Sequence, residues 1–210
     1  MKNFKELINS FTKEDYEQGR VDLHVHSNFS DGKGDVRALL EQAKGYKYIS
    51  FTDHNTMAGY EELYDERVIP GVEFDVWCGY VFMHLLAYGV DYKNEALKLF
   101  FAKTKRETKA DFVRIFARRD IKKLIAAIHE AGGIAVLAHP ACCWALSLEK
   151  FVKKLISYGL DGLEVYYPYA RHRGIIKFHT AAAVERIADK YSLIKTGGSD
   201  LHSENMSPRT

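Results

Sequence analysis

The sequence predicts a single-domain α/β fold, a closed or nearly closed β/α barrel of seven strands. Apolar segments of strand length alternate with amphipathic segments of helix length along most of the chain, as in folds built from repeated βα units. The 210 residues suffice for one core and contain no linker or low-complexity segment. Reactive polar side chains end almost every predicted strand, whereas an open doubly wound sheet, the alternative, gathers its ligands at one switch point.

The chain divides into a short arm and the barrel. Residues 1–19 are predicted to form an N-terminal helical arm that ends at Gly19, and residues 20–210 the barrel. The predicted strands are short and apolar, and they cover residues 20–26, 46–53, 68–77, 80–90, 134–139, 162–167 and 193–198. The turn Trp77-Cys-Gly-Tyr80 predicts that the third and fourth strands pair as a hairpin.

The segments between these strands have apolar residues at helical spacing. They cover residues 35–45, 55–67, 91–132, 148–158 and 175–190. The third of these segments is long enough for two helices. The alternation with strands is the connection pattern of a β/α barrel.

Composition excludes several functional classes. The net charge is +2, with 30 basic and 28 acidic residues interspersed, so no large field is expected to hold nucleic acid or a membrane surface. The sequence has no apolar run of membrane-spanning length and no secretory signal at its start. The three cysteines Cys78, Cys142 and Cys143 suit packing in a reducing compartment. We therefore expect a cytoplasmic protein without a stable nucleic-acid complex.

The stretch from Val21 to Gly32 places two histidines one residue apart. On a strand, alternate side chains share a face, so His24 and His26 point to the same place. Asp31 follows in a loop rich in Ser, Asn, Asp and Gly. This stretch therefore predicts part of a binding site at the end of the first strand.

Similar side chains end the later strands, and in a barrel such ends meet at the C-terminal face. Imidazoles and carboxylates are the donors that borderline divalent metals prefer. Nine such residues are too many ligands for one ion and suffice for two or three. The predicted metal ligands are His24, His26, Asp31, His54, Glu73, His84, His139, Asp200 and His202.

Four further polar residues receive other interpretations. Asp53 and Glu164 are expected to orient ligands rather than bind metal. His129 and His179 lie on predicted helices and are expected to be core or surface residues. Glu73 follows Pro-Gly-Val, an apolar context in which a buried carboxylate requires a compensating cation.

Seven motifs together resemble a known family. In chain order from Asp22 to Ser203 they are DLHVHSNFSDG, FTDHNT, PGVEF, HLLAYGVD, GGIAVLAHP, GLEVYYP and TGGSDLHS. The sequence resembles the polymerase and histidinol phosphatase (PHP) superfamily of metal-dependent phosphoesterases. The resemblance implies a distorted, TIM-like barrel of seven strands that binds three metals, usually manganese, iron or zinc.

The resemblance also implies how the ligands divide, with Glu73 bridging two metals. One metal is held by His24, His26, Glu73 and Asp200, a second by Asp31, His54 and His139, and a third by Glu73, His84 and His202. Two features depart from the family's usual pattern. Ser203 follows His202 where Gly is common, and the segment between His84 and His139 is shorter than in members that act on nucleotides.

The expected reaction is hydrolysis of a phosphate ester of a small molecule or nucleotide by a metal-bridging hydroxide. Arg171 and His172 follow the sixth strand, where they are expected to contact the substrate phosphate. His172, or a metal-site acid such as Asp200 or His202, would protonate the leaving alcohol.

Two other functions remain open. An amidohydrolase-type C–N hydrolase has a similar barrel but typically uses a modified lysine on the fourth strand, where this sequence has His84, and Lys93 lies beyond it. A non-catalytic metal-binding PHP module is the other alternative. Loss of activity normally accompanies loss of ligands, and all nine positions are present, so catalysis is favoured.

Overall fold

A computed structural model describes residues 3–169 and 178–206 of the chain. Seven strands lie in this described part, as predicted: β1 (Val21–Val25), β2 (Tyr48–Phe51), β3 (Gly71–Cys78), β4 (Val81–Tyr88), β5 (Ile134–Leu137), β6 (Gly162–Tyr166) and β7 (Ile194–Gly197). Each lies within or close to a predicted segment, because runs of buried apolar residues mark them clearly.

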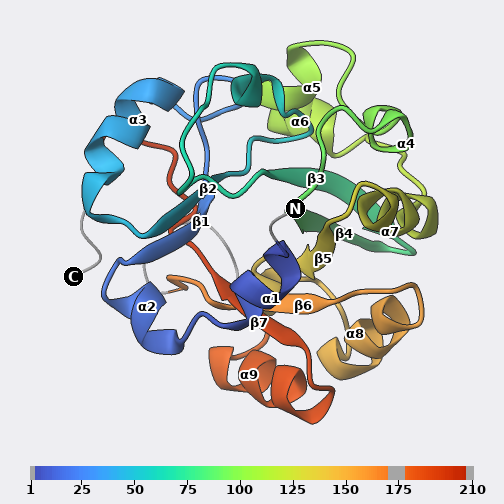
Figure 1. The fold of residues 1–210 in the computed structure, drawn as a ribbon. Helices are drawn as coiled ribbons and strands as arrows, with labels where there is room; N and C mark the ends of the chain where they lie inside the picture. Colours follow the sequence, from blue (N-terminus) through green and yellow to red (C-terminus); the bar gives the residue numbers. More distant parts are fainter. Residues whose placement is uncertain (1–2, 170–177, 207–210) are drawn as a thin grey trace.

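The helices lie mainly outside the strands (Figure 1). They are α1 (Phe4–Asn9), α2 (Lys13–Glu17), α3 (Val36–Gln42), α4 (Glu95–Lys98), α5 (Arg106–Lys109), α6 (Asp111–Arg114), α7 (Ile121–Glu130), α8 (Leu148–Ile156) and α9 (Ala181–Lys190). Short 3₁₀ helices are η1 (Ala43–Gly45), η2 (Ala58–Glu61) and η3 (Pro140–Cys142). Side-chain caps at Asp35, Asp120, Ser147 and Thr180 start four of the longer helices.

Two helix predictions are wrong. The segment 55–67 contains only η2. Its Tyr60 side chain is buried, and the hydroxyl donates to the Phe51 carbonyl and accepts from the Gly71 N–H. The segment 91–132 contains four helices rather than two. Its chain breaks at Ala110, whose extended backbone separates α5 from α6, and the buried Arg114 side chain then reaches the carboxylate of Asp31.

The strands form two sheets. β1 and β2 pair in parallel, and the second sheet has the order β3-β4-β5-β6-β7. The predicted hairpin is confirmed, because β3 and β4 pair antiparallel from Gly71–Tyr88 to Cys78–Val81. β4 and β5 are also antiparallel, and β5, β6 and β7 are parallel.

The prediction of a closed or nearly closed barrel of seven strands is confirmed in part: the described residues form an α/β fold with seven strands, but these strands lie in two sheets and not in one closed barrel. Only isolated bridges join the two sheets, at Val25–Leu201 on one side and at Ile49–Val68 and His54–Glu73 on the other. At the start of β3, the Gly71 N–H donates to the Tyr60 hydroxyl rather than to β2, which interrupts the ladder between these strands. Beyond β7, Asp200 has a φ of 53°, which ends the strand conformation before the chain reaches β1.

The helical arm packs on the rest of the chain. Ile8 and Tyr16 are buried in a core cluster with Leu23 and Tyr88, and Lys5 pairs with Asp161 at 2.8 Å. The larger core cluster combines buried side chains of both sheets with those of α3, α7, α8 and α9. No helix in the described ranges is long and apolar enough to cross a membrane.

Candidate metal centre

The first group of metal-ligating side chains forms around β1. His24 and His26 are buried, and their Nε2 atoms lie 3.1 Å apart. Both atoms face Glu73 Oε2, at 3.3 and 3.2 Å. Asp200 Oδ1 completes the group, at 3.4 and 3.2 Å from the same two nitrogens. These four residues make up the first set that the resemblance implies.

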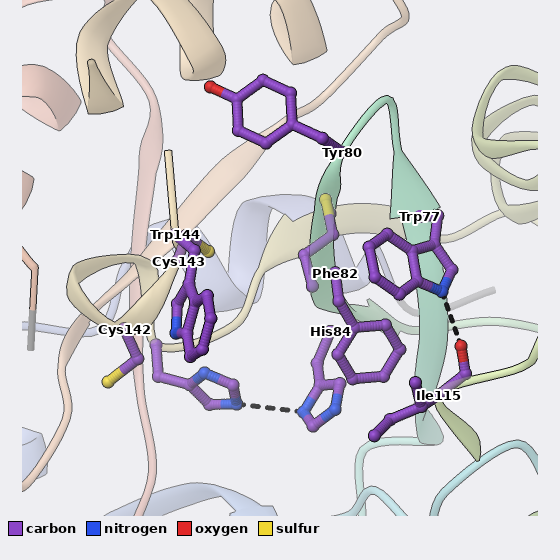
Figure 2. A pocket seen from close by; sticks show the side chains of 10 residues that line it. Trp77, Tyr80, Phe82, His84, Ile115, Cys142, Cys143 and Trp144 are labelled. Atoms are coloured by element: carbon purple, nitrogen blue, oxygen red, sulfur yellow. Dashed lines mark hydrogen bonds between the residues drawn. The ribbon is translucent and has the colours of Figure 1, made fainter. Parts of the chain in front are cut away.

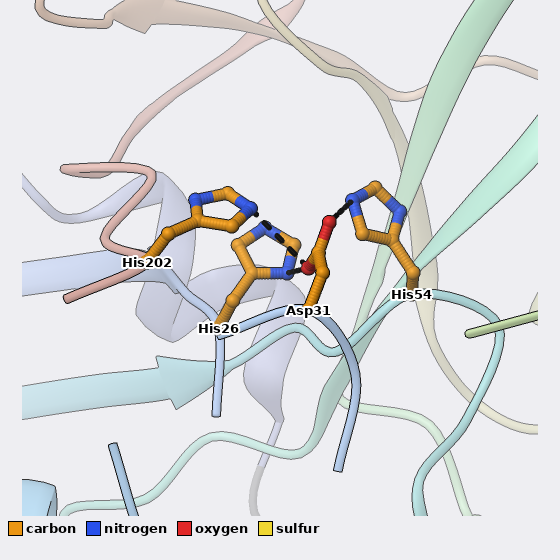
Figure 3. Close-up of side chains that lie close together, drawn as sticks. All are labelled: His26, Asp31, His54 and His202. Atoms are coloured by element: carbon orange, nitrogen blue, oxygen red, sulfur yellow. Dashed lines mark ion pairs between the residues drawn. The ribbon is translucent and has the colours of Figure 1, made fainter. Parts of the chain in front are cut away.

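A second group surrounds the carboxylate of Asp31 (Figure 3). His202 Nε2 lies 3.3 Å from Oδ1, and His26 Nδ1 lies 3.6 Å from the same oxygen. His54 Nε2 faces the other oxygen at 3.7 Å. Figure 3 shows the three imidazoles arranged around this one carboxylate.

The third group uses the other oxygen of Glu73. His84 Nδ1 and His139 Nε2 lie 3.1 and 3.3 Å from Oε1, and these two nitrogens are 3.2 Å apart. Glu73 therefore contributes one carboxylate oxygen to each of two groups, the bridging position that the resemblance implies.

The structure exchanges two of the implied ligands. His139 lies with Glu73 and His84, whereas His202 lies with Asp31. The reason is topological. β5 pairs directly with β4 and brings His139 beside His84, while the segment after β7 bridges β1 at Val25–Leu201 and brings His202 beside His26.

The electrostatics of the cluster suit cations. Burial raises the pKa of Glu73, but the surrounding imidazoles outweigh burial and hold the pKa well below its usual range. Burial lowers the pKa of His26, but Asp200 and Glu73 outweigh burial and raise it to about 9, because these carboxylates favour positive charge at this position, either a proton or a cation that displaces it. Burial lowers the pKa of His54 to about 3, which keeps its ring neutral. Charged carboxylates and a neutral ring nitrogen are the forms in which these groups bind metal.

Two buried atoms support the same conclusion. His54 Nδ1 and Asp75 Oδ1 form no hydrogen bond within the described part of the chain, although they lie 3.5 Å apart and Asp75 Oδ1 is also 3.1 Å from His84 Nε2. Buried polar atoms without partners are rare and costly. Together with the converging lone pairs of the three groups, they show that the donor set fits divalent cations.

Sequence reasoning missed Asp75. It lies two residues after Glu73 on β3 and therefore on the same face. Its Oδ1 is 3.1 Å from His84 Nε2, so that His54, Asp75 and His84 form a further group of possible ligands. The alternation of Glu73 with Asp75 in the sequence was the signal that would have identified it.

Arg114 was also missed. It is buried, its Nη1 donates to Asp31 Oδ2 at 2.8 Å, and its Nε lies 3.7 Å from Asp75 Oδ1. Its position on α6, far along the chain from Asp31, leaves no local pattern that marks it. Arg114 ties the α5–α6 segment to the cluster.

Glu164 and Asp53 hold the ligands or the loop that carries them. Glu164 accepts hydrogen bonds from His24 Nδ1 and from the backbone N–H of His139, both at 2.8 Å. Asp53 accepts from the backbone and hydroxyl of Ser27 and from the Ser30 hydroxyl. Asp53 therefore shapes the loop after β1, in which the Ser30 hydroxyl also lies 3.5 Å from His26 Nδ1.

The remaining predicted residues lie elsewhere. His129 donates to Asp161 and His179 to the carbonyl of Ala145, both outside the cluster. Arg171 and His172 lie outside the described residues.

Backbone conformation is unusual at the ligands. His139 and Asp200 have φ values of 30° and 53°, and Asn55, next to His54, has a φ of 57°. These left-handed conformations cost energy for residues with a Cβ atom and concentrate at functional sites.

Several known proteins are similar to this chain. A phosphoribosyl 1,2-cyclic phosphate 1,2-diphosphodiesterase of Eggerthella lenta is 26% identical over 259 aligned positions, covering 87% of this chain and 94% of the relative. The alignment exceeds the length of this chain, so the relative carries insertions. An uncharacterized protein of Methanocaldococcus jannaschii is 27% identical over 173 positions, covering 72% of this chain and 84% of that protein.

Two solved structures share the fold. A Bifidobacterium adolescentis protein assigned as a metal-dependent phosphoesterase has a TM-score of 0.71 at 24% identity and covers 90% of this chain and 89% of its own. A Chromobacterium violaceum protein named an amidohydrolase has a TM-score of 0.69 at 18% identity, with 88% of each chain covered.

A family model assigns the chain more directly. The model of the PHP domain matches residues 22–131, which include six of the nine predicted metal ligands. This match covers more than half of the sequence, and the chain therefore belongs to the PHP domain family.

Proposed function

We propose that this chain is a metal-dependent phosphoesterase that hydrolyses a phosphate ester of a small molecule or nucleotide. The observation that carries the proposal is the convergence of six imidazoles with the carboxylates of Asp31, Glu73 and Asp200 in overlapping groups. The Eggerthella lenta relative, which is named a phosphodiesterase, supports this class of reaction.

We propose that these nine residues hold two or three divalent cations, of manganese, iron or zinc. When bound, such cations neutralise charge on the phosphoryl oxygens and activate water for attack on phosphorus. Glu73 would serve two of them, because Oε2 faces His24, His26 and His54 whereas Oε1 faces His84 and His139.

Other side chains hold the ligands in orientation. Glu164 accepts the Nδ1 proton of His24, which leaves the Nε2 lone pair directed at Glu73 and Asp200. Tyr167 donates its hydroxyl to Asp200 Oδ2 at 2.8 Å, while Oδ1 faces His24 and His26. Asp75 faces Nε2 of His84 and leaves Nδ1 for the cluster.

Among the described residues, His202 is the proposed proton donor to the leaving alcohol in the state in which its Nε2 does not bind metal. It is the most accessible imidazole of the cluster, with 39% of its side chain exposed, so that a substrate oxygen has room to approach. We also propose that Arg171 and His172 contact the substrate phosphate and that His172 can donate the proton. Asp200 would act through its position beside His24 and His26.

The amidohydrolase alternative is less favoured by the position of Lys93. This residue follows β4, and its ammonium lies over the ring of Tyr92, 5.5 Å from the ring centroid. His84 occupies the strand itself. The similarity to the Chromobacterium violaceum protein concerns the fold alone.

The proposal is tested by phosphate release from mono- and diesters. Purified protein loaded with manganese should hydrolyse p-nitrophenyl phosphate or a nucleotide phosphate, and chelation should stop the reaction. Glu73→Gln should lower kcat/KM by at least about a hundredfold and reduce the bound metal measured by mass spectrometry. Glu95→Gln is the matched control, because Glu95 is 87% exposed.

Two results would contradict the proposal. One is a metal-loaded protein that is silent on a broad panel of phosphomonoesters and phosphodiesters. The other is a Glu73→Gln variant that retains full metal content and activity.

A further inference from the structure

A cavity of about 400 Å³ opens beside the metal-ligating cluster (Figure 2). His84 and His139 belong to its lining, and the same two imidazoles face Glu73 in the third group of ligands. The cavity and the candidate active site therefore share a wall. A molecule with its phosphate at the cluster therefore has room for its remaining part in this cavity.

Aromatic side chains form the walls of the cavity. Figure 2 shows Trp144 on one side and Trp77 with Phe82 on the other, and His84 lies between them at the lower end of the view. The rings of Trp77 and Phe82 are 5.3 Å apart, and Phe82 meets His84 edge-on at 5.4 Å. Such walls favour a flat, apolar ligand group.

Charged side chains do not line the cavity within the described residues. The other lining residues are Tyr80, Met83, Ile115, Cys142 and Cys143. Apart from the two imidazoles, these side chains provide few partners for hydroxyl or charged groups. A polar sugar or a second phosphate would lose hydration there without gaining equivalent hydrogen bonds.

The two indoles are held in place yet remain accessible. Trp77 Nε1 donates to the carbonyl of Ile115 at 2.7 Å, and the Trp144 ring packs against Phe178 at 5.2 Å. Trp77 is 37% exposed and Trp144 is 67% exposed. Accessible apolar surface beside a reactive cluster is what a bound ligand would cover.

We propose that the leaving alcohol of the substrate carries an uncharged aromatic group, which binds in this cavity between Trp77 and Trp144. The inference rests on the proposed phosphoesterase function. In the reaction, the oxygen of water bonds to phosphorus and the bond from phosphorus to the alcohol oxygen breaks. The alcohol oxygen keeps the electron pair and takes a proton, so that the products are a phosphate and an aromatic alcohol.

This substrate class differs from the one that the Eggerthella lenta relative's name indicates. That name denotes a phosphorylated sugar, which is rich in hydroxyl groups. The walls of the cavity in this chain match an aromatic ring better than a sugar. Trp77 and Trp144 are therefore proposed as residues that determine specificity.

The test compares two phosphomonoesters whose leaving alcohols have similar acidity, 2-naphthylmethyl phosphate and methyl phosphate. With manganese-loaded full-length protein, we expect kcat/KM to be at least about tenfold higher for the naphthylmethyl ester, because its ring loses water contact in the cavity. Trp144→Ala should reduce this ratio by about fivefold or more, and Trp144→Phe should retain most of it.

The control is Tyr64→Ala, which removes a ring that is 92% exposed and lies outside the cavity lining. Its ratio should equal that of the unaltered protein. Hydrolysis of both esters with equal kcat/KM, or an unchanged ratio in Trp144→Ala, would overturn the inference and leave the phosphoesterase proposal intact. Hydrolysis of neither ester by a preparation that hydrolyses other phosphate esters would also overturn the inference, whereas silence on the whole panel of mono- and diesters would overturn the proposed function itself.

Discussion

Asp161 binds three donors from three parts of the chain. Its carboxylate accepts from Lys5 Nζ at 2.8 Å, His129 Nε2 at 2.7 Å and the backbone N–H of Ala135 at 2.9 Å. Burial raises its pKa, but the hydrogen bonds from Lys5, Ala135 and His129 outweigh burial and lower the pKa below its ordinary value of 3.8. This single residue connects α1, α7 and β5.

Asp161 should make the folded state sensitive to acid. Its pKa is lower in the folded than in the unfolded chain, so its stabilising effect is present above pH 3.8 and disappears as the pH falls through the folded value. We expect Asp161→Asn to lower the free energy of unfolding by about 1–3 kcal/mol at pH 7. The difference from the unaltered protein should shrink below about pH 4, as measured by denaturant unfolding.

Asp189→Asn is the matched control for this prediction. Asp189 pairs with Lys195 on the surface, and exposed pairs contribute little to stability. A destabilisation by Asp161→Asn that is the same at pH 7 and at pH 3 would show that the charge is not responsible.

At the scale of elements, η2 replaces part of the missing ladder between β2 and β3. The Tyr60 hydroxyl lies 2.7 Å from the Phe51 carbonyl and 3.1 Å from the Ile69 carbonyl, and it accepts from the Gly71 N–H at 2.9 Å. Burial raises the pKa of Tyr60, so its proton stays available for donation. One side chain thus connects the ends of two strands that belong to different sheets.

Tyr60→Phe should therefore destabilise the protein. The substitution retains the buried ring but leaves the Gly71 N–H without its partner, at an expected cost of about 1–3 kcal/mol. Chemical denaturation would measure this change. Tyr64→Phe, at an exposed position, should have no measurable effect. Equal stability of the two variants would contradict the role assigned to the Tyr60 hydroxyl.

Gly198 allows the segment after β7 to pass closely over β1. A Cβ atom at this position would overlap the side chain and backbone of His24. Gly198→Ala should cost about 1–3 kcal/mol through overpacking and should reduce metal content, because His24 would have to move. Gly45→Ala is the control, since a Cβ there would meet no atom within 4 Å. Normal metal content in Gly198→Ala would refute this prediction.

At the scale of the whole molecule, the metal ligands connect the two sheets. On the side of the β1–β2 sheet, His24 lies in β1, and His26 and His54 come shortly after β1 and β2. On the side of the five-stranded sheet, Glu73 and His84 lie in β3 and β4, and His139 comes shortly after β5. Otherwise only isolated bridges and side-chain contacts join these sheets in the described residues. Cations in the cluster would bind ligands from both sheets and thereby hold the sheets together.

Metal binding should therefore raise the thermal stability of the protein. A ligand at a hundred times its Kd stabilises the folded state by about 2.7 kcal/mol, which should increase Tm by several degrees. Calorimetry with manganese and with chelator, at one protein concentration, would measure the shift. His179→Ala should retain it, and Glu73→Gln should lose it. A protein proven to contain metal but unchanged in Tm would disprove the coupling.

Local sequence was sufficient for much of this architecture. Apolar runs marked all seven strands, and the period of two along a strand placed His24 and His26 side by side. The turn around Gly79 identified the β3–β4 hairpin. The apolar context of Glu73 indicated a buried, compensated carboxylate. These features depend on neighbours in the chain, and the chain therefore displays them directly.

Long-range packing set the rest. The exchange of His139 and His202 between groups followed from which strands lie side by side, and Arg114 reached Asp31 from a distant helix. The two sheets in place of a closed barrel followed from the Tyr60 hydroxyl, which takes the Gly71 N–H that would face β2, and from the turn at Asp200. Trp77 and Trp144 came to line one cavity although 67 positions separate them. Such contacts depend on strand order and side-chain packing between distant segments, for which no local period exists.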